Sequence, residues 1–344
     1  MDSQHYDSAP AQGSGGNMTG FDPEFRDIID YILRITYRIW EGKQVGLCRD
    51  YYSEDCPVYT LAGYTEGAEE VVHNTLRTLG AFPDRTLHAD NIVWGGDAAS
   101  GFHSSHLITT RMTNLGPSEF GEATGKSAEI QVIAHCVCRA NQIVEEWLVR
   151  DNLSLARQLG VDIDVWVAER AAAPLDPRYG AWLDREWQRV SATPRDRQAY
   201  AESDLEARIA AGLVNIWSAN LVGDCHQLYE EQAVVHASAR DALEGVEAIK
   251  GWYLTILGAI PDARVTVDYV CSNAMLDDTE YVAARWTLAG THSGAGPWGS
   301  PTGAPLLILG ESHYKCIDGR VVEEWLVFDE LAVLAQIARA RHGA

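Results

Sequence analysis

The residues of this chain that could transfer protons occur twice, at a fixed spacing. Residues 143–151 read Ile-Val-Glu-Glu-Trp-Leu-Val-Arg-Asp, and residues 321–329 read Val-Val-Glu-Glu-Trp-Leu-Val-Phe-Asp, 178 positions later. His135 and His313 precede the two motifs with the same separation of 178. Carboxylates and imidazoles are common general acids and bases in enzymes. The repeat therefore singles out the aspartates that end the two motifs as candidate functional residues.

The repeat extends over whole domains. Thr124-Gly125 matches Thr302-Gly303 at the same separation. Two domains are also the natural expectation for 344 residues. The segment between the repeats contains several tryptophans, so we expect helical pieces packed on the domains rather than a free linker. We predict a disordered tail at 1–20, domain 1 at 21–160, a helical connector at 161–204 and domain 2 at 205–344.

Charge and hydropathy restrict the partners. The chain has 49 acidic and 27 basic residues, a formal net charge of −22, which argues against binding to nucleic acid or to an anionic membrane surface. No run of 18 apolar residues occurs, and the N-terminus has no apolar stretch of a signal peptide. We expect a cytoplasmic protein with a small-molecule partner.

The cysteines do not indicate a disulfide framework or a metal site. Seven are scattered along the chain, and no Cys-x-x-Cys pair is present. Buried free thiols are the expected state. No ligand spacing resembles a zinc site, so no zinc is expected. We expect no other metal or cofactor either, which is what the family resemblance described below implies.

Hydrophobic periodicity predicts helices followed by long strands in each half. The first helix should open at Asp22-Pro23 and continue to Trp40. Further helices are expected at 67–79, 153–159, 205–221, 246–257 and 330–341, and strands at 87–94, 101–114, 127–139, 142–151, 264–271, 281–291, 305–317 and 320–329. The fold class is therefore α+β, with N-terminal helices packed on a strongly curved antiparallel sheet that forms a cone.

Several motifs resemble one known family. Domain 2 has Leu-Glu-Gly-Val-Glu-Ala-Ile-Lys at 243–250, Arg-Trp-x-Leu-x-Gly-Thr-His-x-Gly at 285–294 and Asp-Gly-Arg-Val-Val-Glu-Glu-Trp at 318–325. Domain 1 keeps Glu-Gly-Ala-Glu-Glu-Val-Val at 66–72 and Ala-Phe-Pro-Asp at 81–84. Both units resemble the SnoaL-like polyketide cyclases, within the NTF2-like superfamily of cone-shaped domains.

The resemblance implies acid–base chemistry without a metal. An aspartate at the end of the last strand, here Asp329 or Asp151, would take a proton from a carbon acid in an apolar pocket. Burial at such a pocket would raise the carboxyl pKa toward neutrality. His292, in the Gly-Thr-His segment, is a further catalytic candidate, and domain 1 has Thr113 in its place. The alternative is that each aspartate only caps the helix that follows it.

Strand alternation puts each motif tryptophan, Trp147 or Trp325, on the face of its aspartate. An aromatic pocket wall and ordinary packing both remain open for these two residues. Arg285 and Trp286 are adjacent, so at most one should line the pocket. The remaining candidates for substrate contact are His236, Tyr229, His313 and His135.

The two histidines that precede the motifs are expected to be structural. With a two-residue turn at Asp318-Gly319, His313 and Asp329 point to opposite faces of the sheet. With a bulge after the turn they share a face, but His313 then lies opposite Glu323, roughly 20 Å along the strand from Asp329. Direct contact between the histidine and the aspartate would need a strongly curled sheet.

The favoured function is a small-molecule enzyme of the cyclase or isomerase type, with its base in domain 2 and an apolar or aromatic carbonyl compound as substrate. The two domains should pack sheet to sheet as an intramolecular pseudo-dimer, with a homo-oligomer left open. One alternative is a dehydratase or epoxide hydrolase, which His103 and His106 would favour in domain 1, although three residues apart they face opposite ways. The other is a ligand-binding or assembly module without catalysis.

Overall fold

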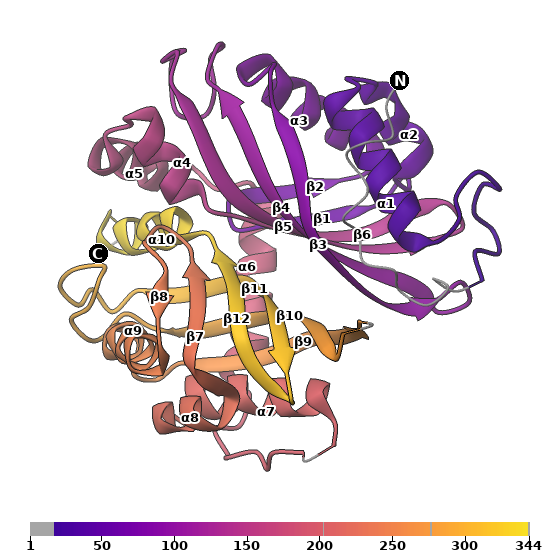
Figure 1. The fold of residues 1–344 in the computed structure, drawn as a ribbon. Coiled ribbons are helices and arrows are strands. Elements are labelled where there is room, and N and C mark those ends of the chain that lie inside the picture. Colours follow the sequence, from indigo (N-terminus) through magenta and orange to yellow (C-terminus); the bar gives the residue numbers. More distant parts are fainter. Residues whose placement is uncertain (1–16, 202, 276, 343–344) are drawn as a thin grey trace.

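The computed structural model describes residues 17–201, 203–275 and 277–342. Residues 1–16, which hold most of the predicted disordered tail, lie outside the described residues. Within the described ranges the chain forms two six-stranded sheets, each covered by its own helices (Figure 1).

Domain 1 begins with helix α1 (Ile28–Thr36), which continues into a π-helical turn, η1 (Tyr37–Glu41). The side chain of Asp27 caps α1 by accepting a hydrogen bond from the backbone N–H of Asp30. The elements that follow are η2 (Val45–Leu47), α2 (Cys48–Tyr51), β1 (Pro57–Thr60), β2 (Gly63–Glu66), α3 (Ala68–Ala81), β3 (Thr86–Asp97), β4 (Gly101–Thr113), β5 (Ser127–Arg139), β6 (Gln142–Arg150) and α4 (Asn152–Leu159).

The connector supplies two helices, and domain 2 then repeats the order of domain 1. The connector helices are α5 (Ile163–Ala172) and α6 (Pro177–Ser191). Domain 2 consists of α7 (Leu205–Trp217), η3 (Val222–Asp224), α8 (Cys225–Leu228), β7 (Tyr229–Ala237), β8 (Leu243–Glu244), α9 (Val246–Ala259), β9 (Arg264–Ala274), β10 (Thr279–Thr291), β11 (Pro305–Ile317), β12 (Arg320–Phe328) and α10 (Glu330–His342).

The two sheets have the same topology. Their strand orders are β2-β1-β6-β5-β4-β3 and β8-β7-β12-β11-β10-β9. Most neighbours are antiparallel hairpin partners, but β1 runs parallel to β6 and β7 runs parallel to β12. Each sheet thus contains one parallel pairing beside the predicted antiparallel ones. The paired strands come from opposite ends of each domain, so no hairpin turn forces them to be antiparallel.

The hairpin between β11 and β12 combines both of the turn geometries considered from the sequence. Asp318 (φ 51°) and Gly319 (φ 73°) make a tight two-residue turn, and a bulge follows, because Cys316 pairs with Val321 while Lys315 pairs with Glu323. The extra residue places His313 opposite Trp325 rather than Glu323. His313 therefore shares a face with Trp325 and Asp329.

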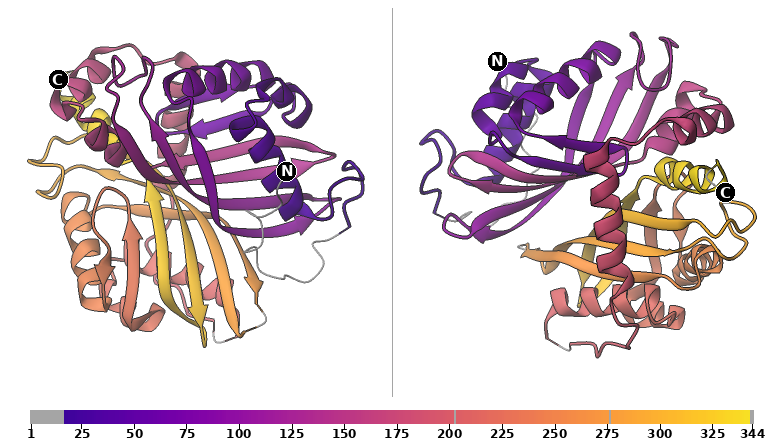
Figure 2. Two further views of the ribbon diagram at one scale, coloured as in Figure 1. Left: turned by 45° about the horizontal axis from the view of Figure 1, so that its top comes forward. Right: turned by 180° about the vertical axis from the view of Figure 1, so that it is seen from behind.

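The two domains meet through their sheets. One apolar cluster contains Leu107 and Val149 from domain 1 together with Leu309 and Val327 from domain 2. Helix α6 runs from one domain to the other, in front of the sheets when the molecule is seen from behind (Figure 2, right), and adds Trp182 to this cluster. We call the face of each sheet toward its own helices the inner face and the face toward the other domain the outer face. Both faces of the central strands are consequently buried.

Candidate functional site

The two glutamates of each Glu-Glu-Trp motif are separated by strand alternation. Glu146 and Glu324 are buried on the inner faces, 7% and 0% exposed respectively. Trp147 and Trp325 pack on the outer-face cluster between the domains. The inner-face glutamates are therefore the motif carboxyls that reach the cones.

The inner face of domain 1 encloses a cavity of about 50 Å³. Its apolar wall comes from α1, η1 and the middle of the sheet, and includes Ile35, Ile39 and Val132. A cavity of this size has room for a few water molecules or for a small functional group of a ligand. The side chains in its lining that could carry chemistry are Glu146, Tyr52, His106, Arg85 and Arg150.

Glu146 is positioned as an acid–base group. Burial raises the pKa of its carboxyl to about 7, because the charged form loses its hydration. A hydrogen bond with Tyr52 and the positive charge of Arg150 act in the opposite direction. At neutral pH both the protonated and the ionised forms of Glu146 are therefore populated.

His106 supplies a second polar group to the same cavity. It is 3% exposed, and its Nε2 atom has no hydrogen-bond partner among the described residues. Burial lowers the pKa of this imidazole to about 3, with a smaller contribution from His313. His106 is therefore neutral near pH 7 and can donate or accept a hydrogen bond without carrying charge.

The cone of domain 2 has the same glutamate but is filled by side chains. The Tyr229 hydroxyl donates to Glu324 at 2.6 Å and lies 3.2 Å from the Tyr253 hydroxyl. Trp286 is 1% exposed, and its ring occupies the space above Gly310. Burial again raises the pKa of Glu324, to about 7. The titration behaviour is shared by the two cones, whereas the open space belongs to domain 1.

Differences between the repeats explain why one cone is open and polar. The residues 178 positions beyond Arg85, His106 and Arg150 are Ala263, Ala284 and Phe328. Ile108 and Val132 similarly correspond to Trp286 and Gly310. Domain 2 has thus exchanged two guanidinium groups and an imidazole for apolar groups, and a large indole fills its cone.

The predicted catalytic aspartates act as helix caps and join the domains. Asp151 accepts from the Ser154 N–H with Oδ1 and from the Ala239 N–H of domain 2 with Oδ2. Asp329 accepts from the Ala332 N–H with Oδ1 and from the Asn152 amide of domain 1 with Oδ2, at 2.5 Å. Each aspartate therefore caps its own helix and also contacts the other domain.

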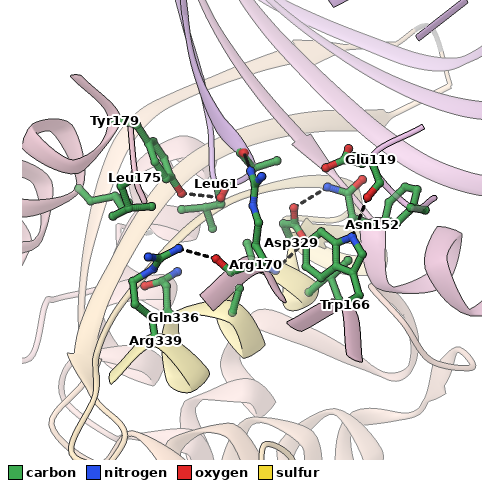
Figure 3. Close-up of a pocket in the computed structure, with 16 residues that line it drawn as sticks. Leu61, Glu119, Asn152, Trp166, Arg170, Leu175, Tyr179, Asp329, Gln336 and Arg339 are labelled. Atoms are coloured by element: carbon green, nitrogen blue, oxygen red, sulfur yellow. Dashed lines mark hydrogen bonds between the residues drawn. The ribbon is translucent and has the colours of Figure 1, made fainter. Parts of the chain in front are cut away.

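Asp329 also borders a cavity between the domains, of about 70 Å³ (Figure 3). The cavity is lined by α10, both connector helices and the loop before β5, with Trp166, Tyr179 and Arg170 in its wall. Burial raises the pKa of Asp329 to about 7. This second cavity is shared by the two domains and lies outside either cone.

The other outer-face candidates take part in contacts between the sheets. Arg285 stacks on Trp147, with its guanidinium carbon 3.4 Å from the ring centroid. Glu311, fully buried on β11, accepts hydrogen bonds from Ser105 at 2.5 Å and from His135 Nδ1 at 3.0 Å. His313 Nε2 lies 2.8 Å from the Ser105 hydroxyl. These contacts place His135 and His313 in a buried polar network between the domains.

The remaining predicted residues lie near the edges of domain 2. His292, just after β10, is fully buried, and its Nδ1 is 3.0 Å from the Thr302 hydroxyl. His236 stacks on Trp325 and is 2.9 Å from Glu323. Of the predicted site residues in domain 2, Tyr229 and Trp286 line the cone, and both help to fill it.

The cavity brings together four residues outside the predicted site: Glu146, Arg85, Arg150 and His106, of which the sequence analysis considered only His106, for the alternative reaction in domain 1. The sequence prediction took the face of the Trp and Asp residues as the pocket face, whereas the domain 1 cavity lies on the opposite, inner face. One signal was present, because three of the four are polar or charged where the second repeat is apolar.

The structure also describes the cysteines, the grouping of potential metal ligands and the length of the helices. All seven cysteines lie within the described ranges, and each is a buried free thiol, as predicted. In the described residues no three His, Cys, Asp or Glu side chains are grouped as metal ligands would be. None of the helices in the described part of the chain has the length and apolar character needed to span a bilayer.

Comparison with known proteins identifies the class. The sequence profile of the SnoaL-like polyketide cyclases matches residues 31–159 and again residues 207–337. The chain therefore belongs to the SnoaL-like polyketide cyclase family and carries the family's α+β domain twice. The predicted family and fold class are confirmed.

Solved structures with similar folds cover one such domain. IdmH from Streptomyces antibioticus, described as a polyketide cyclase, is 28% identical over 37% of this chain and 95% of its own, with a TM-score of 0.31. A SnoaL-like protein from Jannaschia sp. is 19% identical over 41% of this chain and 98% of its own, with a TM-score of 0.33. A comparison with curated proteins finds no significant match.

Proposed function

We propose that this protein is a small-molecule enzyme of the cyclase or isomerase type and that Glu146 is its acid–base group. The observation that carries the proposal is a buried carboxyl, with a pKa raised to about 7, that shares a cavity with the unpartnered Nε2 of His106. The family membership of both domains supports the same class of chemistry.

In the proposed reaction, ionised Glu146 takes a proton from a carbon next to a carbonyl group of the substrate. The electron pair of the broken C–H bond moves onto the carbonyl oxygen and forms an enolate. The Nε2–H tautomer of His106 donates a hydrogen bond to that oxygen, which stabilises its charge in a site of low polarity. Protonated Glu146 then returns the proton to another atom of the substrate.

Asp329 is the second candidate base, because its pKa is also raised to about 7 and it borders the cavity between the domains. Glu146 is favoured because both oxygens of Asp329 already accept hydrogen bonds, one from its own helix and one from Asn152. In this proposal Asp329 and Asp151 hold the domains together, and domain 2 serves as a scaffold.

The test is the exchange of carbon-bound protons for deuterium in a panel of cyclic and aromatic ketones, with and without a carboxylate group, followed by NMR. Loss of a general base typically lowers a rate by about 10²- to 10⁴-fold, so we expect Glu146→Gln to lose at least ~100-fold. Glu324→Gln is the matched control, because it removes the equivalent carboxyl from the filled cone. Wild-type exchange should rise with pH and level off above about 7.

Three results would contradict the proposal. If Asp329→Asn abolishes exchange while Glu146→Gln keeps it, the base is Asp329. If Glu324→Gln lowers exchange as much as Glu146→Gln does, the effect is one of folding. If the wild-type protein catalyses no exchange on any ketone of the panel, a ligand-binding or assembly module becomes the better account.

A further inference from the structure

Two arginine side chains in the lining of the domain 1 cavity, Arg85 and Arg150, take part in no ion pair among the described residues. Arg85 is 6% exposed, donates its Nε–H to the Thr110 hydroxyl at 3.0 Å and stacks on Trp40. The Nε of Arg150 is buried and has no hydrogen-bond partner in the described ranges.

The two guanidinium groups are close enough to affect each other. Burial lowers the pKa of Arg85 to about 9, and the charge of Arg150 adds to this effect. Burial also lowers the pKa of Arg150. Like charges that share a cavity of low polarity repel each other, and the buried Nε–H of Arg150 remains without a hydrogen-bond partner among the described residues.

The protein neutralises this pair only in part, because Glu119 and Asp329, which lie outside the cavity lining, attract Arg150 without forming an ion pair with it. Glu146 is the acidic side chain in the cavity lining, and its pKa of about 7 leaves it only partly ionised at neutral pH. His106 is uncharged there. The cavity therefore carries a positive charge inside a chain whose formal net charge is −22. An uncompensated charge in a cavity of low polarity costs free energy, and an anion bound there would compensate it.

The second repeat shows that the fold does not require these charges. Ala263 and Phe328 stand where domain 1 has Arg85 and Arg150, and both are buried in the apolar core of domain 2. The same architecture is thus built with apolar groups at both positions. A role for the two arginines in binding accounts for this difference, whereas a role in folding does not.

We propose that Arg85 and Arg150 form an anion subsite that binds a carboxylate of the substrate. The subsite rests on the proposed function and defines its substrate class: a small carbonyl compound that also carries a carboxylate. Guanidinium groups match the two oxygens of a carboxylate with paired N–H donors. The cavity of about 50 Å³ suits this compact group, while Ile35, Ile39 and Val132 contact apolar atoms beside it.

Acetate and its neutral isostere acetamide test the subsite on the full-length protein, by calorimetric titration at pH 7 and constant ionic strength. We expect saturable binding of acetate and at least ~10-fold weaker binding of acetamide. Arg150→Met and Arg85→Met should each weaken acetate binding by at least ~10-fold. The control is Arg77→Met, which removes an exposed arginine of α3 that donates to Asn74. It should leave acetate binding unchanged.

A second measurement does not depend on the arginine variants folding. An anion bound beside Glu146 favours the protonated form of the Glu146 carboxyl, so the protein should take up protons when acetate binds. This uptake is measured by repeating the titration in buffers of different ionisation enthalpy and comparing the binding enthalpies. Glu146→Gln should abolish the proton uptake and keep the binding. Equal binding of acetate and acetamide, or unchanged acetate binding in Arg150→Met, overturns the subsite. Tighter binding of inorganic phosphate than of acetate overturns the assignment to a carboxylate.

These outcomes separate the two proposals. If acetate binds as expected but no ketone exchanges protons, the anion subsite stands and the acid–base function is wrong. If exchange depends on Glu146 but acetate does not bind, the function stands and the carboxylate assignment is wrong.

Discussion

Replacement of Gly310 by alanine should destabilise domain 2, because Trp286 occupies the space that a side chain would need. A Cβ atom at Gly310 would lie 2.2 Å from Cη2 and Cζ2 of Trp286, whereas ordinary contacts begin at 3.4 Å. The indole is 1% exposed and packs near Trp217, with ring centroids 6.1 Å apart, so it has little freedom to move. Overpacking of a core costs about 1–3 kcal/mol, and we expect roughly 3 kcal/mol here.

The assay is urea unfolding followed by far-UV circular dichroism. Gly63→Ala is the matched control, since a Cβ at Gly63 in β2 meets nothing within 4 Å. The double variant Trp286→Ile with Gly310→Val copies Ile108 and Val132 of domain 1. Trp286→Ile alone should cost about 3 kcal/mol through the cavity it leaves.

The two changes should partly compensate when they are combined. We expect the double variant to be less destabilised than the sum of the single variants by at least about 1 kcal/mol. If Gly310→Ala stays within about 0.5 kcal/mol of the wild type, or if the two changes are additive, the indole is not confined as described.

Three further predictions concern titrating and capping groups. Burial raises the pKa of Glu324 from 4.5 to about 7, so between pH 4.5 and 7 the chain takes up a proton on folding, and the free energy of unfolding falls as pH rises through this range. The part of this fall that Glu324 causes is on the order of 3 kcal/mol. Glu324→Gln should remove it when urea unfolding is compared at pH 5 and 8. Burial lowers the pKa of His103 and His313 from 6.5 to about 4, so the unfolded chain binds their protons first and stability should fall as pH drops from about 6.5 to 4. The measurement is thermal unfolding of the wild type and of His313→Gln over this pH range. A difference in stability between the two proteins that does not change with pH would contradict the prediction. Asp151→Ala should cost about 1 kcal/mol through loss of the cap and raise hydrogen exchange at the Ser154 amide, and unchanged exchange there would refute the capping role.

Strand and helix positions were largely predictable because the periodicity is strong. The strands expected at 127–139 and 305–317 agree with β5 and β11 at both ends. The turns between the long strands carry Asn or Gly at positive φ, such as Asn141 and Gly319, which marks them in the sequence. Strands β1, β2, β7 and β8 were missed. Three of them have only two to four residues, which is too few for a readable period.

The cavity residues could not be derived in the same way. Alternation shows that Glu146 and Trp147 face opposite sides of β6, but it does not show which side is the pocket. In a strand with one face exposed to solvent, the polar residues would mark the solvent side and the apolar residues the side of the core. Here one side packs on α1 and η1 and the other on domain 2, so both sides carry buried residues and the pattern is ambiguous.

The sequence by itself determined the tandem repeat, the family, the order of the elements and the pairing of a carboxyl with an aromatic residue in each motif. These features depend on local periodicity and on identity between two segments of one chain. Only the tertiary structure decided that Asp151 and Asp329 join the domains and that Glu146, His106, Arg85 and Arg150 meet in one cavity. The reason is physical: contacts between strands depend on sheet register, on a bulge beside the turn and on the packing of one domain against the other, and none of these is encoded in the spacing of residues along the chain.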